Sequence, residues 1–352
     1  MPSIAAVTTA VPPHVLTQDQ ARAFAEKHFR ARRDDIARLL PAFEHAGIAT
    51  RYVVVEPEWF DTGHDFAEQN AQYIDWSIRL GTDVVASCLR QAGLEPSEIT
   101  HIVFVSTTGL ATPSIDARLV NRCALSSHVA RTPVWGLGCA GGAAGLSLAY
   151  RLALSDPGAK VLLVVVELCS LTFHPHDFSR SNVIATALFG DGAAGAVVVG
   201  DRVTSPHGSP RILDAQSTTW PDSLDVMGWN FDAFGMQVVF SRAIPQIVRS
   251  RVRENVTAFL KRSTLSLAEL SALIAHPGGA KVIAAYQEAL ALPDAMFEHP
   301  RAVLRDYGNM SAASALFVLK RVIDGGAIPA GGHALLTALG PGFSSENVLL
   351  RF

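Results

Sequence analysis

The sequence has few charged residues and no block of either charge. Only 17% of its 352 residues are charged, and the formal net charge is -3. Because no run of lysine and arginine offers a basic surface, a nucleic-acid partner is not expected. The same composition is 49% hydrophobic, which predicts a large core and some apolar surface buried between subunits.

Long apolar runs are absent as well. The main central run, residues 161–166, ends at Glu167, a length that suits a buried strand and is too short to span a bilayer. Residues 1–10 contain no basic leader and have the pattern of a first strand. We therefore expect no membrane span and a cytoplasmic protein.

Cysteine is scarce, and its spacing excludes the common metal motifs. The four cysteines are Cys88, Cys123, Cys139 and Cys169. They form no Cys-x-x-Cys pair and no Cys/His group with zinc spacing, so no metal site is expected. A reducing compartment suits this pattern. Cys88, Cys123 and Cys169 lack a glycine turn around them and are interpreted as core residues.

Cys139 has different surroundings. It lies in Gly-Cys-Ala-Gly-Gly at residues 138–142, between an apolar segment and a segment rich in small residues. This pattern predicts a strand, a sharp turn and a helix, with the sulfur at the helix N-terminus. Unpaired N–H groups and the helix dipole favour a thiolate there, so Cys139 is the candidate nucleophile.

Alternating strand and helix patterns indicate an α/β fold. We expect a helix over residues 71–92, irregular structure over residues 56–70, and a strand over residues 101–106. Residues 201–215 are rich in Pro, Gly and Ser and form the best boundary. They predict an N-terminal half, residues 1–200, and a C-terminal half, residues 211–352.

The two halves repeat one another at an offset of about 170 residues. Three strand–turn–helix units recur in the same order, which predicts a duplicated domain with pseudo-twofold symmetry. The repeat makes Asn309 the counterpart of Cys139, so the two turns should meet at the centre. It also makes His276 the counterpart of Val105, at the end of a central strand, where open α/β sheets bind ligands.

A cysteine, a histidine and an asparagine are thus predicted to converge. A hydrogen-bonded pair of Cys139 and His276 would form a thiolate–imidazolium that accepts acyl groups. The Asn309 amide, together with an N–H of His276, could hold a developing oxyanion. Papain-like proteases also use these residue types, but their local signatures do not occur in this sequence.

Several motifs together resemble the thiolase superfamily, and within it the type III polyketide synthases, which are similar to chalcone synthase. They are Gly-Cys-Ala-Gly-Gly, His-Pro-Gly-Gly at residues 276–279, Gly-Asn-Met-Ser at residues 308–311 and Leu-Gly-Pro-Gly-Phe at residues 339–343. The resemblance implies a thiolase-like fold of two αβαβα halves. Ketoacyl synthase III enzymes share the three residues but usually carry His-Gln-Ala-Asn, so they are the alternative enzyme class, and a non-catalytic protein of this fold is the other alternative.

The resemblance implies an acyltransferase whose substrates are acyl-CoA and malonyl-CoA. Cys139 would carry the starter acyl group as a thioester, while His276 and Asn309 would stabilise the enolate formed when malonyl-CoA loses CO2. Repeated condensation would then extend the chain. The resemblance implies a homodimer. It implies no metal, redox cofactor or carrier protein.

Further residues match positions that shape the family's substrate sites. Phe189 matches a gatekeeper that would help to expel the malonyl carboxylate. Hydroxyl residues match cavity positions, although each could instead bond local backbone, and a turn matches the loop of the cyclisation pocket. These positions are Thr107, Thr172 and Ser311 for the cavity, and Gly340, Pro341 and Gly342 for the loop. Arg38, His45 and Arg301 are the candidates for the CoA phosphates.

Departures from the plant enzymes point to a different starter. Val238 replaces a second gatekeeper phenylalanine, with Phe240 two residues on, Thr112 replaces a methionine and Pro41 replaces an arginine. Thr107 stands where tetrahydroxynaphthalene synthases have a second cysteine, which argues against that product. The N-terminal half is most similar to bacterial synthases of alkylpyrones and alkylresorcinols. We therefore expect a medium- or long-chain fatty acyl-CoA starter and pyrone or resorcinol products.

Overall fold

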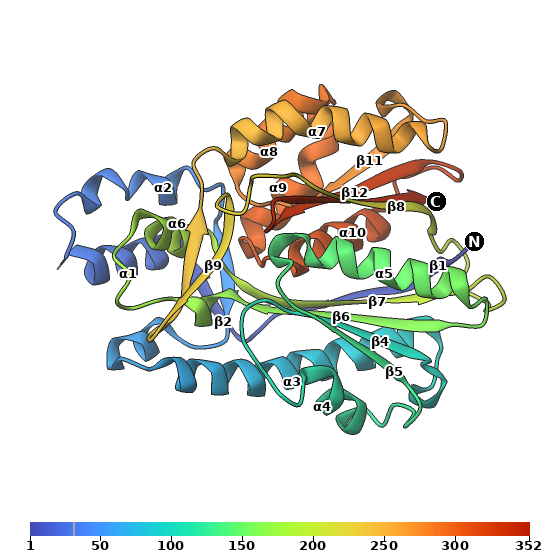
Figure 1. The fold of residues 1–352 in the computed structure, drawn as a ribbon, viewed down its shortest axis with the longest axis horizontal. Coiled ribbons are helices and arrows are strands. Elements are labelled where there is room, and N and C mark those ends of the chain that lie inside the picture. Colours follow the sequence, from blue (N-terminus) through green and yellow to red (C-terminus); the bar gives the residue numbers. More distant parts are fainter. Residues whose placement is uncertain (31) are drawn as a thin grey trace.

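The computed structural model describes residues 1–30 and 32–352. Two β layers enclose a central pair of helices and are covered by further helices on their outer faces (Figure 1). This αβαβα arrangement confirms the fold class and the duplication expected from the sequence. The chain crosses from the first half to the second between strands β7 and β8.

Four strands of each β layer follow the same order, and the first layer has a fifth. The first runs β1-β7-β6-β4-β5 and the second β8-β13-β12-β11, and one pairing of Ser3 with Arg211 joins them. The strands of the first layer are β1 (Ser3–Ala10), β4 (His101–Val105), β5 (Ala130–Val134), β6 (Lys160–Leu168) and β7 (Asp191–Val199). Those of the second are β8 (Arg211–Thr219), β11 (Leu270–Ala275), β12 (His333–Gly340) and β13 (Ser344–Arg351).

One expectation about the second layer is wrong. β11, which precedes His276, is an edge strand in the part of the chain that the structure describes, whereas its counterpart β4 lies between β6 and β5. In residues 1–30 and 32–352 no strand follows β11 in the order, so the second layer there lacks an equivalent of β5. His276 is therefore at the end of an edge strand rather than a central one.

The helices are divided among the layers. The central pair is α5 (Gly141–Ser155) and α10 (Ala313–Gly325), and the outer helices are α3 (Phe66–Ala92) and α4 (Ile115–Arg122) below with α7 (Ile244–Lys261) and α8 (Ala280–Leu290) above. α3 begins five residues earlier than predicted because Asp65 and Glu68 form a capping box. Part of the segment expected to be irregular, residues 57–62, is a 3-10 helix.

Smaller elements gather at one end of the molecule, opposite the two chain termini (Figure 1). They include two antiparallel ladders, β2 with β3 and β9 with β10, that pair outside the main sheet. The elements are β2 (His14–Thr17), α1 (Gln18–Arg30), α2 (Pro41–Glu44), β3 (Thr50–Val53), α6 (Arg180–Leu188), β9 (Met227–Asp232), β10 (Gly235–Phe240) and α9 (Glu298–Tyr307). They cover the cavities described below.

Residues 1–30 and 32–352 contain neither a candidate membrane span nor a candidate metal cluster. None of the helices there is both long and apolar enough to cross a bilayer. No group of three or more His, Cys, Asp or Glu side chains has the arrangement of a metal site in the same residues.

The central helices approach closely because glycine stands at their contact. A Cβ atom added to Gly142 would lie only 2.1 Å from the carbonyl oxygen of Ala312, the residue that precedes α10. Real Cβ atoms do not come that near to an oxygen, so a side chain at residue 142 would push the two helix starts apart. The contact thus fixes the distance between the turn that carries Cys139 and the turn that carries Asn309.

We predict that Gly142→Ala destabilises the fold and impairs the site. Forcing a methyl group against backbone costs about 1–3 kcal/mol, so thermal unfolding should move to lower temperature. Gly325→Ala is the matched control, because its Cβ would meet only a ring carbon of His299 at 3.8 Å and alanine favours the helix. Equal unfolding temperatures for both variants would contradict the argument.

Candidate active site

Cys139 lies at the sharp turn between the first layer and α5. The chain leaves β5, passes through a 3-10 turn at Gly138–Ala140 and enters α5, as the motif predicted. Gly138 has a left-handed φ of 46°, and a Cβ there would lie 2.8 Å from Pro341. The Gly340–Pro341–Gly342 loop therefore packs directly on the cysteine turn, with the Cys139 side chain 6% exposed.

His276 and Asn309 come from the other half and face the same cavity as Cys139. His276 follows β11, and Asn309 follows α9 and precedes α10. The Asn309 amide nitrogen donates to the carbonyl of Gly278 at 3.2 Å, and its oxygen accepts from the N–H of Ser311 at 2.9 Å. All three predicted residues line one cavity of about 730 Å³, the catalytic cavity.

The His276 ring is buried but has no hydrogen-bond partner within the described residues. The side chain is 4% exposed, and neither Nδ1 nor Nε2 is bonded. Burial lowers the pKa of His276 to about 4, because a charged imidazolium would be poorly solvated there. A neutral imidazole can accept a proton on one ring nitrogen and donate from the other. Both nitrogens of His276 are therefore available to a bound substrate.

The thiolate–imidazolium pair predicted from the sequence is absent from the described structure. No hydrogen bond joins Cys139 to His276 among the described residues, and burial raises the pKa of Cys139 to about 12. The Glu167 carboxylate raises it further, whereas hydrogen bonding to Ser311 and Asn309 lowers it. Burial thus favours the neutral form of both groups, because a thiolate or an imidazolium would be poorly solvated there. Transfer of the thiol proton to His276 would have to accompany substrate binding.

Glu167 is a member of the site that the sequence reasoning missed. It is fully buried near the end of β6 and accepts from the Thr107 N–H at 2.9 Å, the Thr108 hydroxyl at 3.0 Å and the Ser311 hydroxyl at 3.1 Å. Burial raises the pKa of Glu167 to about 7. A carboxylate that ends the most apolar run of the chain was the available signal, since such a strand rarely holds an unpartnered charge.

The three predicted cavity hydroxyls have different surroundings. The Thr107 hydroxyl accepts from the N–H of Gly138 at 3.1 Å and so supports the cysteine turn. Thr172 lines a second cavity, and its hydroxyl donates to the carbonyl of Cys169 at 2.7 Å. Ser311 bonds Glu167 beneath Cys139. Thr172 thus bonds local backbone, the alternative that the sequence left open, whereas Thr107 bonds the backbone of the distant cysteine turn.

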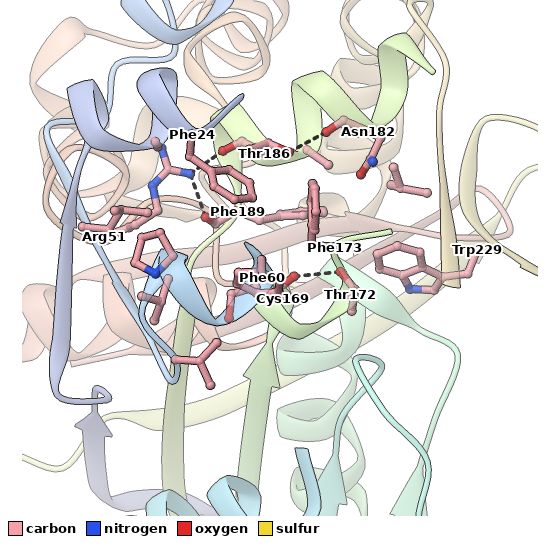
Figure 2. Close-up of a pocket in the computed structure, with 18 residues that line it drawn as sticks. Phe24, Arg51, Phe60, Cys169, Thr172, Phe173, Asn182, Thr186, Phe189 and Trp229 are labelled. Carbon is pink, nitrogen blue, oxygen red and sulfur yellow. Dashed lines mark hydrogen bonds between the residues drawn. The ribbon is translucent and has the colours of Figure 1, made fainter. Parts of the chain in front are cut away.

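Phe189 lies between the catalytic cavity and this second cavity. Its backbone forms a bridge with Asn309, and its ring lines the second cavity, here called the apolar pocket, of about 70 Å³. The rings of Phe24, Phe60 and Phe173 meet in the pocket with centroids 5.2 to 5.9 Å apart (Figure 2). Cys169 and Thr172 lie beneath these rings.

Arg51, at the edge of the apolar pocket, holds Phe189 in place and was also missed. Its guanidinium donates to the carbonyls of Phe189 at 2.8 Å, Thr186 at 2.9 Å and Ala187 at 2.9 Å (Figure 2). These carbonyls lie at the C-terminal end of α6, where helix carbonyls have no partner within the helix, and the Gln18 amide also donates to that of Ala187 at 3.1 Å. Burial lowers the pKa of Arg51 to about 10, which leaves it charged.

Basic side chains surround the catalytic cavity. Arg38 and His45, the predicted CoA contacts, line it, and the structure adds Arg180, Arg242 and Lys281. Among the described residues, no aspartate or glutamate belongs to the lining. Arg301 is not among the residues that line this cavity, so its predicted contact with CoA stays a prediction. It donates to Asp294 at 2.8 Å and to Gln287 at 2.7 Å, on the surface of α9.

Comparison with known proteins gives one consistent family. The family described as "Chalcone and stilbene synthases, N-terminal domain" matches residues 2–202, and the corresponding C-terminal domain matches residues 211–352. A "Putative chalcone synthase" of Bacillus subtilis is 41% identical, over 100% of this chain and 99% of the relative. A 1,3,6,8-tetrahydroxynaphthalene synthase of Streptomyces peucetius is 38% identical, over 99% of this chain and 93% of the relative.

A solved structure has the same fold. The crystal structure of 1,3,6,8-tetrahydroxynaphthalene synthase from Streptomyces coelicolor, a bacterial type III polyketide synthase, superimposes with a TM-score of 0.93 at 27% identity. The alignment covers 99% of each chain.

The raised pKa of Glu167 predicts a pH dependence of stability. The folded protein holds the Glu167 proton up to a pH of about 7, whereas an ordinary glutamate releases it near 4.5. The wild type should therefore lose up to about 3 kcal/mol relative to Glu167→Gln as pH rises through that window. Urea unfolding at several pH values measures this difference. Glu254→Gln, on the exposed face of α7, should run parallel to the wild type, and a parallel Glu167→Gln curve would refute the prediction.

Proposed function

Since the chain belongs to the chalcone and stilbene synthase family and is a type III polyketide synthase with a thiolase-like fold, we propose that it extends a medium- or long-chain fatty acyl-CoA. Malonyl-CoA would supply the extender units, and the product would close to a pyrone or a resorcinol. The apolar pocket beside Phe189 carries this proposal.

The loading step follows from the neutral state of the two buried groups. When acyl-CoA enters, the Cys139 thiol would pass its proton to the free nitrogen of His276 and attack the thioester carbonyl. The carbon–sulfur bond to CoA breaks, and the leaving thiolate takes the proton back from His276. Acyl-Cys139 and free CoA result, with no change in oxidation state.

The condensation step uses the same residues in another role. The N–H of neutral His276 and the N–H of the Asn309 amide that is not bonded to Gly278 would donate to the thioester carbonyl of malonyl-CoA. Loss of CO2 then leaves an enolate that these donors stabilise. The enolate carbon attacks acyl-Cys139, a carbon–carbon bond forms and the cysteine thiolate leaves. Since decarboxylation drives the step, we propose that neither a metal nor a redox cofactor takes part.

The ring of basic residues supports CoA binding at the entrance. CoA carries several phosphate charges, and Arg38, His45, Arg180, Arg242 and Lys281 line a cavity without carboxylates. Positive charge around a concave site attracts such anions and orients them. We propose these residues as the CoA contacts in place of Arg301.

The shape of the apolar pocket supports a fatty starter. It shares Leu16, Phe24, Val53 and Pro57 with an open cleft of about 840 Å³ near α1, so an acyl chain could continue toward the surface. The tetrahydroxynaphthalene relatives suggest a second candidate, a malonyl starter. The threonine at residue 107, whose hydroxyl bonds backbone, supports the fatty starter over that alternative.

The earlier alternatives receive less support. The family match favours a polyketide synthase over a ketoacyl synthase III, and it favours an enzyme over a non-catalytic protein of the same fold. The expected homodimer stays a prediction, which the particle mass in solution would test. Exposed Trp135 and Phe231, with ring centroids 6.0 Å apart, are apolar surface that a second copy could cover.

We predict that the catalytic residues separate into two functions. Cys139→Ala should make no polyketide but should still decarboxylate malonyl-CoA, because the enolate donors remain. Asn309→Ala should lower decarboxylation about 10²- to 10³-fold, as for loss of one oxyanion donor, yet still gain the mass of an acyl group. Product analysis, CO2 release and intact mass measure these effects. Polyketide formation by Cys139→Ala would disprove the assignment of the nucleophile.

We predict that starter preference rises with chain length. Each buried methylene contributes about 0.8 kcal/mol, so kcat/KM should rise about fourfold per methylene until the pocket is full. A panel of acyl-CoAs from acetyl to palmitoyl, offered in competition with malonyl-CoA present, measures the profile. A preference for 4-coumaroyl-CoA, or product from malonyl-CoA alone, would reject the fatty starter while leaving the synthase assignment intact.

A further inference from the structure

One face of the β9–β10 hairpin forms a wall common to both cavities. Met227 and Phe240, paired near its base, line the catalytic cavity. Trp229 and Val238, the next pair on the same face, line the apolar pocket. The Phe189 ring lies beside this wall, with its centroid 5.6 Å from that of Phe240 and 6.4 Å from that of Trp229. The position of the hairpin therefore sets the width of the passage along Phe189.

The hairpin has little support of its own. β9 and β10 pair only with each other in the described structure, and an isolated two-stranded ladder is marginally stable. Its base is closed by a bond from the Ser241 N–H to the Val226 carbonyl at 2.9 Å. Among the described residues, one hydrogen-bonded pair ties residues 227–240 to another part of the protein, and it lies at the far end, where Asp232 meets His174.

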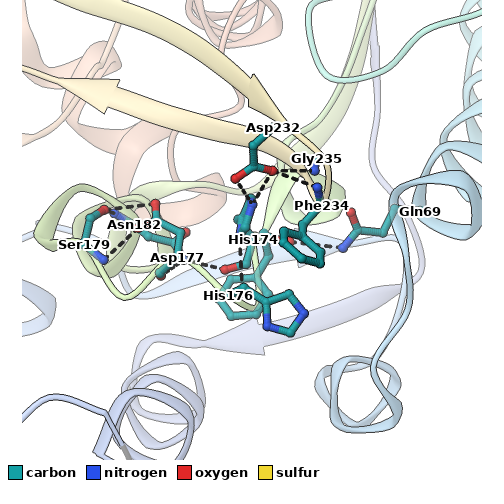
Figure 3. Close-up of polar contacts among 10 residues, drawn as sticks. Gln69, His174, His176, Asp177, Ser179, Asn182, Asp232, Phe234 and Gly235 are labelled. Carbon is teal, nitrogen blue, oxygen red and sulfur yellow. Dashed lines mark hydrogen bonds and ion pairs between the residues drawn. The ribbon is translucent and has the colours of Figure 1, made fainter.

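His174 is a fixed anchor for that end. It is 3% exposed, and its Nδ1 accepts the N–H of His176 at 3.2 Å. Nε2 must then carry the proton, and it lies 3.0 and 3.1 Å from the two carboxylate oxygens of Asp232 (Figure 3). This hydrogen bond lowers the pKa of Asp232, so the acceptor is ionised.

The loop that carries His174 is itself rigid and belongs to the pocket. Gln69 of α3 donates to the Phe173 carbonyl at 3.1 Å, and Asn182 of α6 donates to the His174 carbonyl at 2.9 Å (Figure 3). Thr172 and Phe173 line the apolar pocket from this loop. The His174–Asp232 pair thus connects two walls of the pocket, one held by α3 and α6 and the other the hairpin, whose remaining contacts are side-chain packing such as that of Phe234 on His176.

We propose that His174 and Asp232 are positioning residues that hold the hairpin against Phe189 and so limit the length of the acyl chain that the enzyme accepts. The inference rests on the proposed acyl-CoA starter. Neither residue touches the reacting atoms. Without the pair, the far end of the hairpin would be free to move away from Phe189 and carry Trp229 and Val238 with it. A wider passage would admit further methylenes.

The test must separate the effect of the His174–Asp232 hydrogen bond from the effect of the bonds that Asp232 makes within the hairpin turn. Asp232 also accepts from the N–H groups of Phe234 at 2.8 Å and Gly235 at 3.1 Å within the hairpin. Asp232→Ser keeps a short acceptor for these groups but withdraws the carboxylate from His174. Asp232→Asn keeps an oxygen for both and is the conservative rescue. Glu288→Ala is the matched control, because it removes an exposed ion pair between Glu288 of α8 and Arg249 of α7.

The measurement is kcat/KM for acyl-CoAs of increasing length. Asp232→Ser should move the preferred chain about two methylenes longer, with about a tenfold rise in the ratio of long- to short-chain kcat/KM. Its rate of malonyl-CoA decarboxylation without starter should equal that of the wild type. Asp232→Asn and Glu288→Ala should retain the wild-type profile. Trp229→Ala removes the indole ring from the pocket wall directly and should shift the chain-length profile in the same direction. It remains informative if Asp232→Ser does not fold.

Each other outcome overturns the proposal. An unchanged profile for Asp232→Ser, a shifted profile for Asp232→Asn, or an unchanged profile for Trp229→Ala would show that the pair does not set chain length. If the wild type turns over fatty acyl-CoAs and Asp232→Ser behaves identically, this inference alone fails. If the wild type accepts no fatty acyl-CoA, the proposed starter fails and the inference fails with it.

Discussion

The close contact between the two central helices is the constraint on which the site depends. Gly142 allows α5 to approach the carbonyl of Ala312, and this approach brings a turn from each half of the duplicated fold to the molecular centre. Cys139 arrives from one half, and Asn309 and His276 arrive from the other. Because backbone touches backbone there, the distance between nucleophile and amide is fixed by main-chain packing and does not rely on flexible side chains.

Burial at this centre determines the chemistry of the resting site. Cys139 and His276 are both removed from water, and this burial shifts the pKa of each group in the direction of its neutral form. A helix terminus alone does not compensate for that loss of solvation. Buried Glu167 lies close to these groups and accepts hydrogen bonds from Thr107, Thr108 and Ser311. The nucleophile, its turn and the Asn309 turn are thereby joined through one buried carboxyl group.

Phe189 links this centre to the apolar pocket. Its backbone pairs with Asn309, its carbonyl binds Arg51, and its ring faces a hairpin that spans both cavities. The catalytic residues lie on the rigid layers, whereas the wall of the pocket lies on a two-stranded ladder outside the main sheet. The catalytic residues and the pocket wall, which we propose limits the length of the acyl chain, thus lie on parts of the fold that differ in rigidity.

The sequence alone determined the α/β class, the duplication and the convergence of Cys139, His276 and Asn309, because strand periodicity, glycine turns and an internal repeat are local patterns. The sequence could not predict that β5 has no counterpart in the described part of the second layer, or which groups Glu167 and Arg51 bind. It also could not predict that Arg301 lies outside the lining of the catalytic cavity. Each of these depends on contacts between distant segments. The Cys139–His276 ion pair was predicted from the helix N-terminus, a local feature. Only the tertiary structure decided that burial prevails, because desolvation is set by everything packed around the two side chains.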